Sequence, residues 1–201
     1  MTTYRLLRTS WGWFGLVARE HGLLSTFLPQ PQRDLRRRIK ERFSSAAEFD
    51  ALLPGFCHQV RQYFDGQATR FDVEIDIGDM PPFRQMVLEL CRKVPYGKTA
   101  TYADLARAAG KPAAARAVGG VMAHNPLPLV IPCHRILRSD GSLGGYSSRG
   151  GLNEKTRLLR LEGAMDAEEL LATARRDARP HIDEAPRGER IYRRARFAGV
   201  A

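Results

Sequence analysis

The alternation of apolar and polar positions at the start of the chain predicts a β-meander. Residues 4–9, 13–19 and 23–28 are rich in β-branched, aromatic and aliphatic side chains, and short turn-forming segments separate them. Pro29 and Pro31 are expected to stop the third strand. The basic run over residues 33–42 has few apolar residues. It predicts a solvated loop or helix face, with nucleic-acid contact as the alternative.

Two further patterns complete an N-terminal unit. Apolar residues at helical spacing predict an amphipathic helix from Pro54 to about Asp65; they are Phe56, Val60, Tyr63 and Phe64. Between residues 71 and 77 every second residue is apolar, which predicts a half-buried strand. Residues 1–77 are therefore expected to form a small α/β domain with an antiparallel sheet, and residues 78–82 a linker.

Residues 83–163 predict a mostly helical domain. An apolar stripe runs from Phe83 to Val94, and Thr101 can then cap a helix that extends through Ala109. A short turn at residues 110–112 leads to a second helix over residues 113–124, which is the pattern of a helix-turn-helix. The predicted fold class is therefore α+β. Residues 164–201 are polar and Arg-rich, with a short helical stretch around Leu170 and partial disorder expected beyond it.

One face of the second helix of this pair is almost free of side chains. Five residues share the face expected to pack: Ala114, Ala117, Val118, Val121 and Met122. The opposite face carries Ala115, Arg116, Gly119, Gly120 and Ala123. Mid-helix glycines cost roughly 1 kcal/mol each relative to alanine, so close approach of a partner or tight helix packing should compensate. A smooth face lacks the side chains that read base edges, so nucleic-acid contact here would depend on shape and phosphates.

The net charge of +10 is concentrated in the helical domain. Residues 81–163 contain 13 Lys and Arg against 5 Asp and Glu, which is the electrostatic footprint of a phosphate-backbone partner. No apolar run is long enough for a membrane span. The three cysteines, Cys57, Cys91 and Cys133, are widely spaced, which argues against a disulfide framework or a metal site and indicates a cytoplasmic setting.

The segment from Asn125 to Arg135 contains the strongest chemical candidate. Its prolines favour extended or turn geometry, so the Cys133-His134 pair is expected on a stiff non-helical segment. A cysteine placed in this way is either a packed thiol or a nucleophile activated by a neighbouring base. The glycine- and serine-rich loop over residues 139–151 is expected to act as a lid or to bind an anion. Lys155 and Glu162 share one side of the following helix, where solvated charges are the alternative.

Pro-Cys-His-Arg at residues 132–135, within Asn-Pro-Leu-Pro-Leu-Val-Ile-Pro-Cys-His-Arg-Ile, resembles the signature of the O6-alkylguanine-DNA alkyltransferases. This family is also called the methylated-DNA–protein-cysteine methyltransferases. The likeness includes Val-Pro-Tyr-Gly-Lys-Thr at 94–99, Ala-Ala-Arg-Ala-Val-Gly-Gly at 114–120 and Gly-Tyr at 145–146, and covers residues 81–163. The N-terminal domain resembles the family's variable α/β domain only loosely.

The resemblance implies a single-turnover repair enzyme that needs no metal or cofactor. Cys133 would be the nucleophile and permanent acceptor of the alkyl group from O6-alkylguanine, with O4-methylthymine as a possible further substrate. His134 would take the thiol proton through a water, Glu162 would orient His134, and Asn125 would support the turn. A neighbouring base is needed because a free thiol is mostly protonated at neutral pH.

The resemblance also implies how the lesion is held. Tyr102 and Lys155 would polarise the flipped guanine. A backbone N–H of Ser147 or Ser148 would reach O6, and the carbonyl groups of Cys133 and Ile136 would hold the exocyclic amine. The loop from Tyr146 to Gly151 is about two residues longer than the family pattern, although loops tolerate such insertions; this change bears on the serine assignment and on the width of the pocket.

Base flipping is required because O6 is out of reach of a thiolate in a stacked duplex. Arg116 would enter the duplex in place of the extruded nucleotide, while the smooth helix face of Ala115, Gly119, Gly120 and Ala123 lies in the minor groove with weak sequence preference. The expected partner is double-stranded DNA, and the protein is expected to be monomeric, without a membrane partner, and nucleoid-associated when bound to DNA. Two alternatives are a non-catalytic lesion-binding protein of the same fold and a helix-turn-helix transcription factor.

Overall fold

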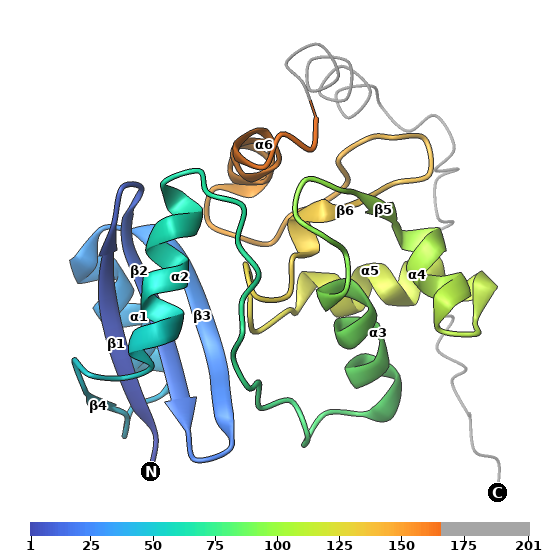
Figure 1. Ribbon diagram of the computed structural model, residues 1–201. Coiled ribbons are helices and arrows are strands. Elements are labelled where there is room, and N and C mark those ends of the chain that lie inside the picture. The colour runs from blue at the N-terminus through green and yellow to red at the C-terminus, as the bar shows by residue number, and fades with distance from the viewer. Residues whose placement is uncertain (166–201) are drawn as a thin grey trace, which may run out of the picture.

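The computed structural model describes residues 1–165, and its N-terminal part is a mixed four-stranded sheet (Figure 1). The strand order is β3-β2-β1-β4. The strands are β1 (Thr3–Thr9), β2 (Gly12–Arg19), β3 (Gly22–Gln30) and β4 (Ala47–Glu48). The first three form the antiparallel meander that the sequence predicts, and β4 adds a short parallel edge to β1. Contrary to the prediction, Pro29 lies within β3, at the edge of the sheet where a missing N–H is tolerated.

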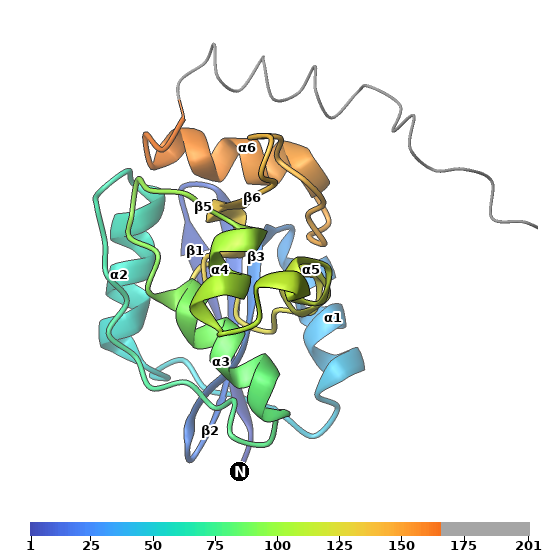
Figure 2. The ribbon, with the colours of Figure 1, turned by 90° about the vertical axis from the view of Figure 1, so that its right-hand side faces the viewer.

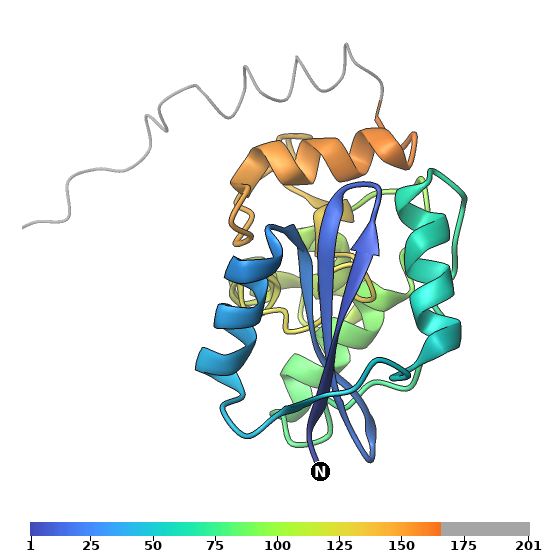
Figure 3. The same ribbon diagram turned by 90° about the vertical axis from the view of Figure 1, so that its left-hand side faces the viewer.

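Two helices cover opposite faces of this sheet, as Figure 3 shows. Helix α1 (Gln32–Arg42) buries Leu35 and Ile39 against the face that carries Tyr4 and Val17. The basic run is thus one face of a helix and not a loop. Helix α2 (Pro54–Phe64), which the sequence predicts, packs its apolar stripe on the other face with Leu7 and Phe14.

The predicted strand over residues 71–77 is wrong. The segment is extended, but it makes only one isolated bridge, between Ile75 and Leu23 of β3. Further along β3 the edge is already occupied, because the N–H of Thr26 donates to the carbonyl of Pro126. The alternation therefore reflects a half-buried extended segment without a neighbouring strand.

The helical part contains α3 (Pro82–Arg92), α4 (Tyr102–Ala108) and α5 (Ala115–Ala123), with a 3₁₀ turn η1 (Pro112–Ala114) before α5. Thr101 caps α4, as predicted, and forms a capping box with Asp104. The remaining elements are β5 (Ala100–Thr101), the 3₁₀ turn η2 (Cys133–Arg135), β6 (Ile136–Leu137) and α6 (Gly151–Leu161). Short parallel pairing of β5 with β6 ties the start of α4 to the segment after Cys133. Figure 2 shows α4 and α5 from the side on which they face solvent.

The hydrophobic core is continuous between the sheet and the helices. One cluster contains Phe14 of β2 and Tyr63 of α2 together with Val118 and Met122 of α5 and with Cys133. The expected boundary at residues 78–82 stays a prediction, and the expectations for residues beyond 165, including the stretch around Leu170, lie outside the described residues. None of the helices within residues 1–165 has the length and apolar character needed to cross a membrane.

Candidate active site

The segment from Asn125 to Cys133 forms a buried, tightly bonded loop. Leu129 adopts a φ of 81° and is 1% exposed. Such a conformation is unfavourable for a branched side chain and persists only where packing enforces it. The N–H of Cys133 donates to the carbonyl of Ile131 at 2.8 Å. The loop thereby places the cysteine at the start of a 3₁₀ turn, in agreement with the non-helical geometry expected from the prolines.

Asn125 connects this loop to the thiol. Its Nδ2 donates to the carbonyl of Ile131 at 2.8 Å and to Sγ of Cys133 at 3.2 Å, and its Oδ1 accepts from the N–H of Leu127 at 3.0 Å. Cys133 is 6% exposed, and burial raises its pKa although Asn125 and the charge of Lys155 act in the opposite direction. The thiol is therefore protonated at rest and needs a base before it can act as a nucleophile.

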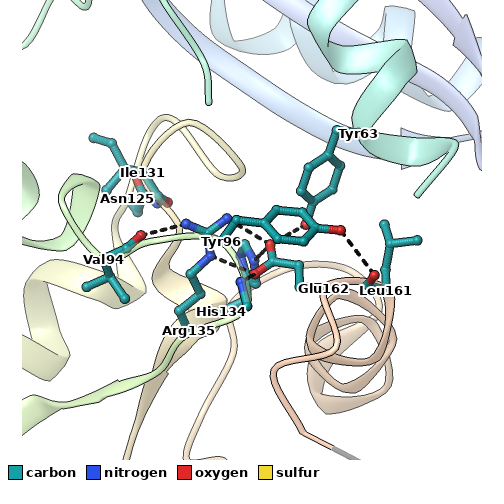
Figure 4. A network of polar contacts seen from close by, with 10 residues as sticks. Tyr63, Val94, Tyr96, Asn125, Ile131, His134, Arg135, Leu161 and Glu162 are labelled. Atoms are coloured by element: carbon teal, nitrogen blue, oxygen red, sulfur yellow. Dashed lines mark hydrogen bonds and ion pairs between the residues drawn. The ribbon is translucent and has the colours of Figure 1, made fainter. Parts of the chain in front are cut away.

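His134 and Glu162 lie behind the cysteine and are both shielded from solvent. His134 Nε2 lies 2.8 Å from Oε1 of Glu162, and Nδ1 of His134 is buried without a protein partner among the described residues (Figure 4). Burial lowers the pKa of His134, so its neutral form is favoured. Burial alone would raise the pKa of Glu162, but hydrogen bonds from His134 and Arg135 lower it to about 2. The pair is thus a neutral imidazole held by a carboxylate, as a general base requires.

Arg135 completes this network. Its Nε and Nη2 donate to the two oxygens of Glu162 at 2.7 and 2.9 Å, and its Nη1 donates to the carbonyl of Val94 at 2.6 Å. A bidentate guanidinium of this kind compensates a buried carboxylate. Sequence reasoning placed Arg135 within the motif without giving it a role, because its carboxylate partner lies 27 residues further along the chain.

The N-terminal unit also contacts Glu162. Tyr63 of α2 donates its hydroxyl to Oε1 of Glu162 at 2.6 Å (Figure 4). Tyr96 packs edge-on against Tyr63 and donates to the carbonyl of Leu161 at 3.1 Å. Sequence reasoning counted Tyr63 only as an apolar helix position, because nothing local indicates a partner 99 residues away in the chain.

Lys155 is a buried cation and not a solvated one. It is 0% exposed, and its Nζ donates to the carbonyl groups of Ile136, at 2.6 Å, and of Leu143. Lys155 therefore joins α6 to the segments on both sides of residues 138–142. The carbonyl of Ile136, expected to hold the exocyclic amine, already accepts this hydrogen bond.

A cleft of about 760 Å³ opens between α5 and the loop over residues 138–147. Its lining brings together half of the site residues selected from the sequence: Tyr102, Ala115, Arg116, Gly119, Ala123, Cys133 and Ser147. Arg138 also lines the cleft and was given no role beforehand, whereas the further lining residues Ser139, Gly145 and Tyr146 belong to the loop expected to act as a lid. The Tyr146 ring is close enough to the thiol that burial, and then the charge of Cys133, raise the pKa of its hydroxyl well above the usual value.

The outer face of α5 is open, as the sequence predicts. A Cβ added at Gly119 or Gly120 would meet no atom within 4 Å. Tight packing inside the protein therefore does not explain these glycines, and an external partner remains as the reason. On the packing face Val118 and Met122 are buried. Ala117 is exposed, contrary to the prediction, because the face of α5 turned toward the core is narrower than the five-residue face expected from helical periodicity.

A second cleft, of about 340 Å³, reaches Cys133 from the side of the sheet. Tyr146 and Ser147 line both clefts, whereas Ser148 lines only this one. The lengthened loop is attached to the N-terminal unit, because Arg149 forms a 2.8 Å ion pair with Asp34 of α1. No group of three or more His, Cys, Asp or Glu side chains suited to a metal ion occurs among residues 1–165.

Comparison with known proteins identifies the family. The family model described as "6-O-methylguanine DNA methyltransferase, DNA binding domain" matches residues 82–164. The inducible methylated-DNA–protein-cysteine methyltransferase of Bacillus subtilis is 36% identical over 141 residues, which cover 69% of this chain and 77% of that protein. The chain belongs to the methylated-DNA–protein-cysteine methyltransferase family. The family member of Mycobacterium tuberculosis is 44% identical over 108 residues, 54% of this chain, and the chain spans 64% of that relative's length.

Solved structures of this methyltransferase family share the fold. The crystal structure of Mycobacterium tuberculosis O6-methylguanine methyltransferase superposes with a TM-score of 0.67 and 33% sequence identity, covering 86% of this chain and 99% of that one. The structure of the same organism's protein in complex with DNA gives a TM-score of 0.68 at 33% identity, with 84% and 99% covered. These likenesses confirm the α+β fold class.

Proposed function

We propose that this protein repairs O6-alkylguanine in double-stranded DNA by transferring the alkyl group to Sγ of Cys133, once per molecule. One observation carries the proposal: Cys133 lines both clefts described above, is followed by a histidine that contacts Glu162, and has a side-chain-free helix face beside the cleft mouth. The relatives from Mycobacterium tuberculosis and Bacillus subtilis are named for this activity, as methylated-DNA–protein-cysteine methyltransferases. The buried, protonated thiol fits a reagent that is activated only when its substrate is in place.

The transfer step needs a base, a nucleophile and a stabilised leaving group. The thiol proton passes to Nδ1 of His134 through a water, with Glu162 and Arg135 fixing the ring. The sulfur then forms a bond to the alkyl carbon as the bond from that carbon to O6 breaks. The electron pair leaves on guanine, and the hydroxyl of Tyr102 donates a proton to it. The Tyr102 phenolate then regains a proton from solvent as His134 releases the thiol proton to solvent. The positive charge of Lys155 favours the thiolate through space.

Binding to DNA is proposed to follow from the outer face of α5. The face that carries Ala115, Gly119, Gly120 and Ala123 lets backbone approach the minor groove, and Arg116 fills the place of the flipped nucleotide. A relative from Mycobacterium tuberculosis was crystallised with DNA, which supports this assignment. A backbone N–H of Ser147 or Ser148 is proposed to meet O6. A monomeric, cytoplasmic protein with weak sequence preference stays a prediction.

Mass spectrometry tests the proposal. After the protein is mixed with a duplex that contains one O6-methylguanine, the peptide with Cys133 should gain one methyl group. This gain should be absent in Cys133→Ala. It should persist in Cys91→Ala, which removes a thiol that is 0% exposed and lines neither cleft next to Cys133. An unmodified Cys133 combined with tight binding of the damaged duplex would instead establish a non-catalytic lesion-binding protein.

A further inference from the structure

Three arginines near the active site have no acidic partner. Arg38 and Arg42 belong to α1, and Arg84 belongs to α3. Within residues 1–165 none of them forms an ion pair with a carboxylate; each donates instead to a neutral oxygen. Arg38 reaches Oε1 of Gln30 at 3.3 Å, Arg42 reaches Oγ of Ser25 at 3.4 Å, and Arg84 reaches the carbonyl of His124.

The other side of α1 is organised differently. Arg36 pairs with Glu48, and Arg37 pairs with Asp34 and Glu41. The two flanks of one helix thus differ: Arg36 and Arg37 on one flank are neutralised, although Arg33 beside them forms no ion pair among the described residues, whereas neither arginine of the other flank is paired. Both arginines of α1 that line the cleft leading to Cys133, Arg38 and Arg42, are unpaired, whereas the unpaired Arg33 points away from this cleft with Arg36 and Arg37.

Arg42 lies within the electrostatic influence of the other two cations. Burial lowers the pKa of Arg42, and the charges of Arg38 and Arg84 lower it further. In addition, Nε of Arg84 is buried and lacks a hydrogen-bond partner among the described residues. Like charges held together without a counter-charge are unfavourable in the free protein, so an anionic ligand would relieve the repulsion.

The position of this arginine cluster indicates which anion it meets. Arg84 donates to the carbonyl of His124, the residue that ends α5. The cluster therefore begins where the smooth face of α5 stops and continues onto α1; in Figure 2, α1 and α5 lie along the same edge of the molecule. A duplex that lies against α5 has backbone phosphates on both sides of its minor groove, and guanidinium groups match phosphate oxygens well.

We infer that Arg38, Arg42 and Arg84 bind backbone phosphates of the DNA strand that passes the end of α5. The N-terminal unit then contributes directly to DNA binding, and α1 extends the interface of the helical unit. The inference rests on the proposed function in one respect, since it assumes that α5 faces the duplex. It assigns the side of α1 that carries Arg38 and Arg42 to the DNA interface and leaves the side with Arg36 and Arg37 outside it.

The salt dependence of duplex binding tests this inference. Each phosphate contact contributes about 0.9 to the slope of log K against log salt concentration. The double variant Arg38→Gln/Arg42→Gln should therefore lower the slope by roughly 2 and weaken binding about tenfold or more at low salt. The matched control is Arg33→Gln/Arg37→Gln, which removes the same charge from the other flank of the same helix. It should change the slope by less than one contact. Thermal unfolding of both doubles verifies the fold.

Two results would overturn the inference. Either the slope of the Arg38→Gln/Arg42→Gln protein equals that of the unmodified protein, or both doubles lower it equally, which would indicate only the loss of net charge. The methyl-transfer assay on unmodified protein is independent of this comparison. If Cys133 takes up no methyl group while the slope still falls selectively, the phosphate contacts stand and the transferase assignment fails.

Discussion

The hydroxyl of Tyr63 donates a 2.6 Å hydrogen bond to Oε1 of Glu162, the same oxygen that lies 2.8 Å from Nε2 of His134. A helix that packs on the N-terminal sheet therefore holds the carboxylate that orients the base. The phenol, the imidazole and the Arg135 guanidinium surround Glu162 from different elements. The two parts of the chain thus share one catalytic network in addition to one core.

Replacement of Tyr63 by phenylalanine should slow alkyl transfer by about three- to tenfold and destabilise the fold. Loss of a hydrogen bond to a charged group costs about 1.5–3 kcal/mol, and part of that loss appears as a less well oriented His134. The measurements are single-turnover transfer to a damaged duplex and urea unfolding. Tyr4→Phe is the matched control, because Tyr4 also donates to a glutamate, Glu48, at 3.0 Å but on the far side of the sheet. Equal transfer rates in the two variants would exclude a role for Tyr63 in positioning the base.

Stability should decrease as the pH falls toward 2, and Glu162 should account for part of the decrease. Its folded-state pKa of about 2 lies below the ordinary value of 4.5. A carboxyl with a lowered pKa stabilises the fold fully above 4.5, and this contribution, roughly 3 kcal/mol, is lost as the pH falls through about 2. Urea unfolding of the unmodified protein and of Glu162→Gln between pH 2 and 6 measures it. The difference in unfolding free energy between the two proteins should shrink at the acid end.

The transfer rate should be nearly constant between about pH 7 and 8. Burial lowers the pKa of His134 from 6.5, so the neutral base is already present across this range, while burial raises the pKa of Cys133 from 9.0. In His134→Gln the residual rate should instead rise with pH, because the thiol must ionise into solvent. Quenched single-turnover reactions with a damaged oligonucleotide at several pH values measure the transfer rate of the unmodified protein and of His134→Gln. A tenfold rise per pH unit in the unmodified protein would show that the thiol ionises without histidine.

Substitutions at Gly120 should separate stability from DNA binding. Gly120→Ala should stabilise the fold by about 0.5–1 kcal/mol, since alanine favours a helix and the added Cβ meets no protein atom. Gly120→Leu should also fold but weaken duplex binding tenfold or more, because its side chain occupies the space that backbone and groove would share. Gly55→Leu is the control and should leave binding nearly intact, because Gly55 is an exposed glycine of α2 in the N-terminal unit, where an added Cβ also meets no protein atom. Unfolding and fluorescence anisotropy provide the two readouts.

Arg116→Ala should slow transfer from duplex DNA far more than transfer from free O6-methylguanine. The side chain is expected to fill the stack that the flipped nucleotide leaves, and the free base has no stack to leave. Arg107→Ala is a suitable control, since Arg107 is an exposed arginine of the neighbouring helix that pairs with Asp104. Equal slowing of both reactions in Arg116→Ala would place its effect on the cleft itself and not on flipping.

The local features of the chain could be predicted from the sequence. Thr101 caps α4 through a side chain three residues from its partner, and the meander follows from turns between adjacent strands. The segment over residues 71–77 shows the limit of this reasoning. Its alternation indicates one buried side, but whether a strand forms depends on a free neighbouring edge. On β3 the N–H of Thr26 already donates to the carbonyl of Pro126, beyond the single bridge at Leu23.

The site residues could be predicted where they belong to the sequence motif. They could not be predicted where tertiary contacts between distant elements determine them. Asn125 contacts Cys133 and His134 contacts Glu162, so the residues named from the motif form two adjacent pairs. Tyr63 could not be found, because its helical position is apolar and its partner is set by tertiary packing. The open face at Gly119 and Gly120 could be expected, but only the structure shows that no part of the protein fills it.

The short length of α5 has a consequence for when the protein can recognise damage. The helix has nine residues, two of them glycine, and lacks a side-chain cap. A peptide of this length and composition is not helical alone in water, so the recognition surface exists only while Val118 and Met122 remain anchored in the core. Folding and DNA affinity are thus coupled equilibria. Bound duplex should raise the melting temperature, and on the proposed function a partly unfolded copy would lack the surface that meets a lesion.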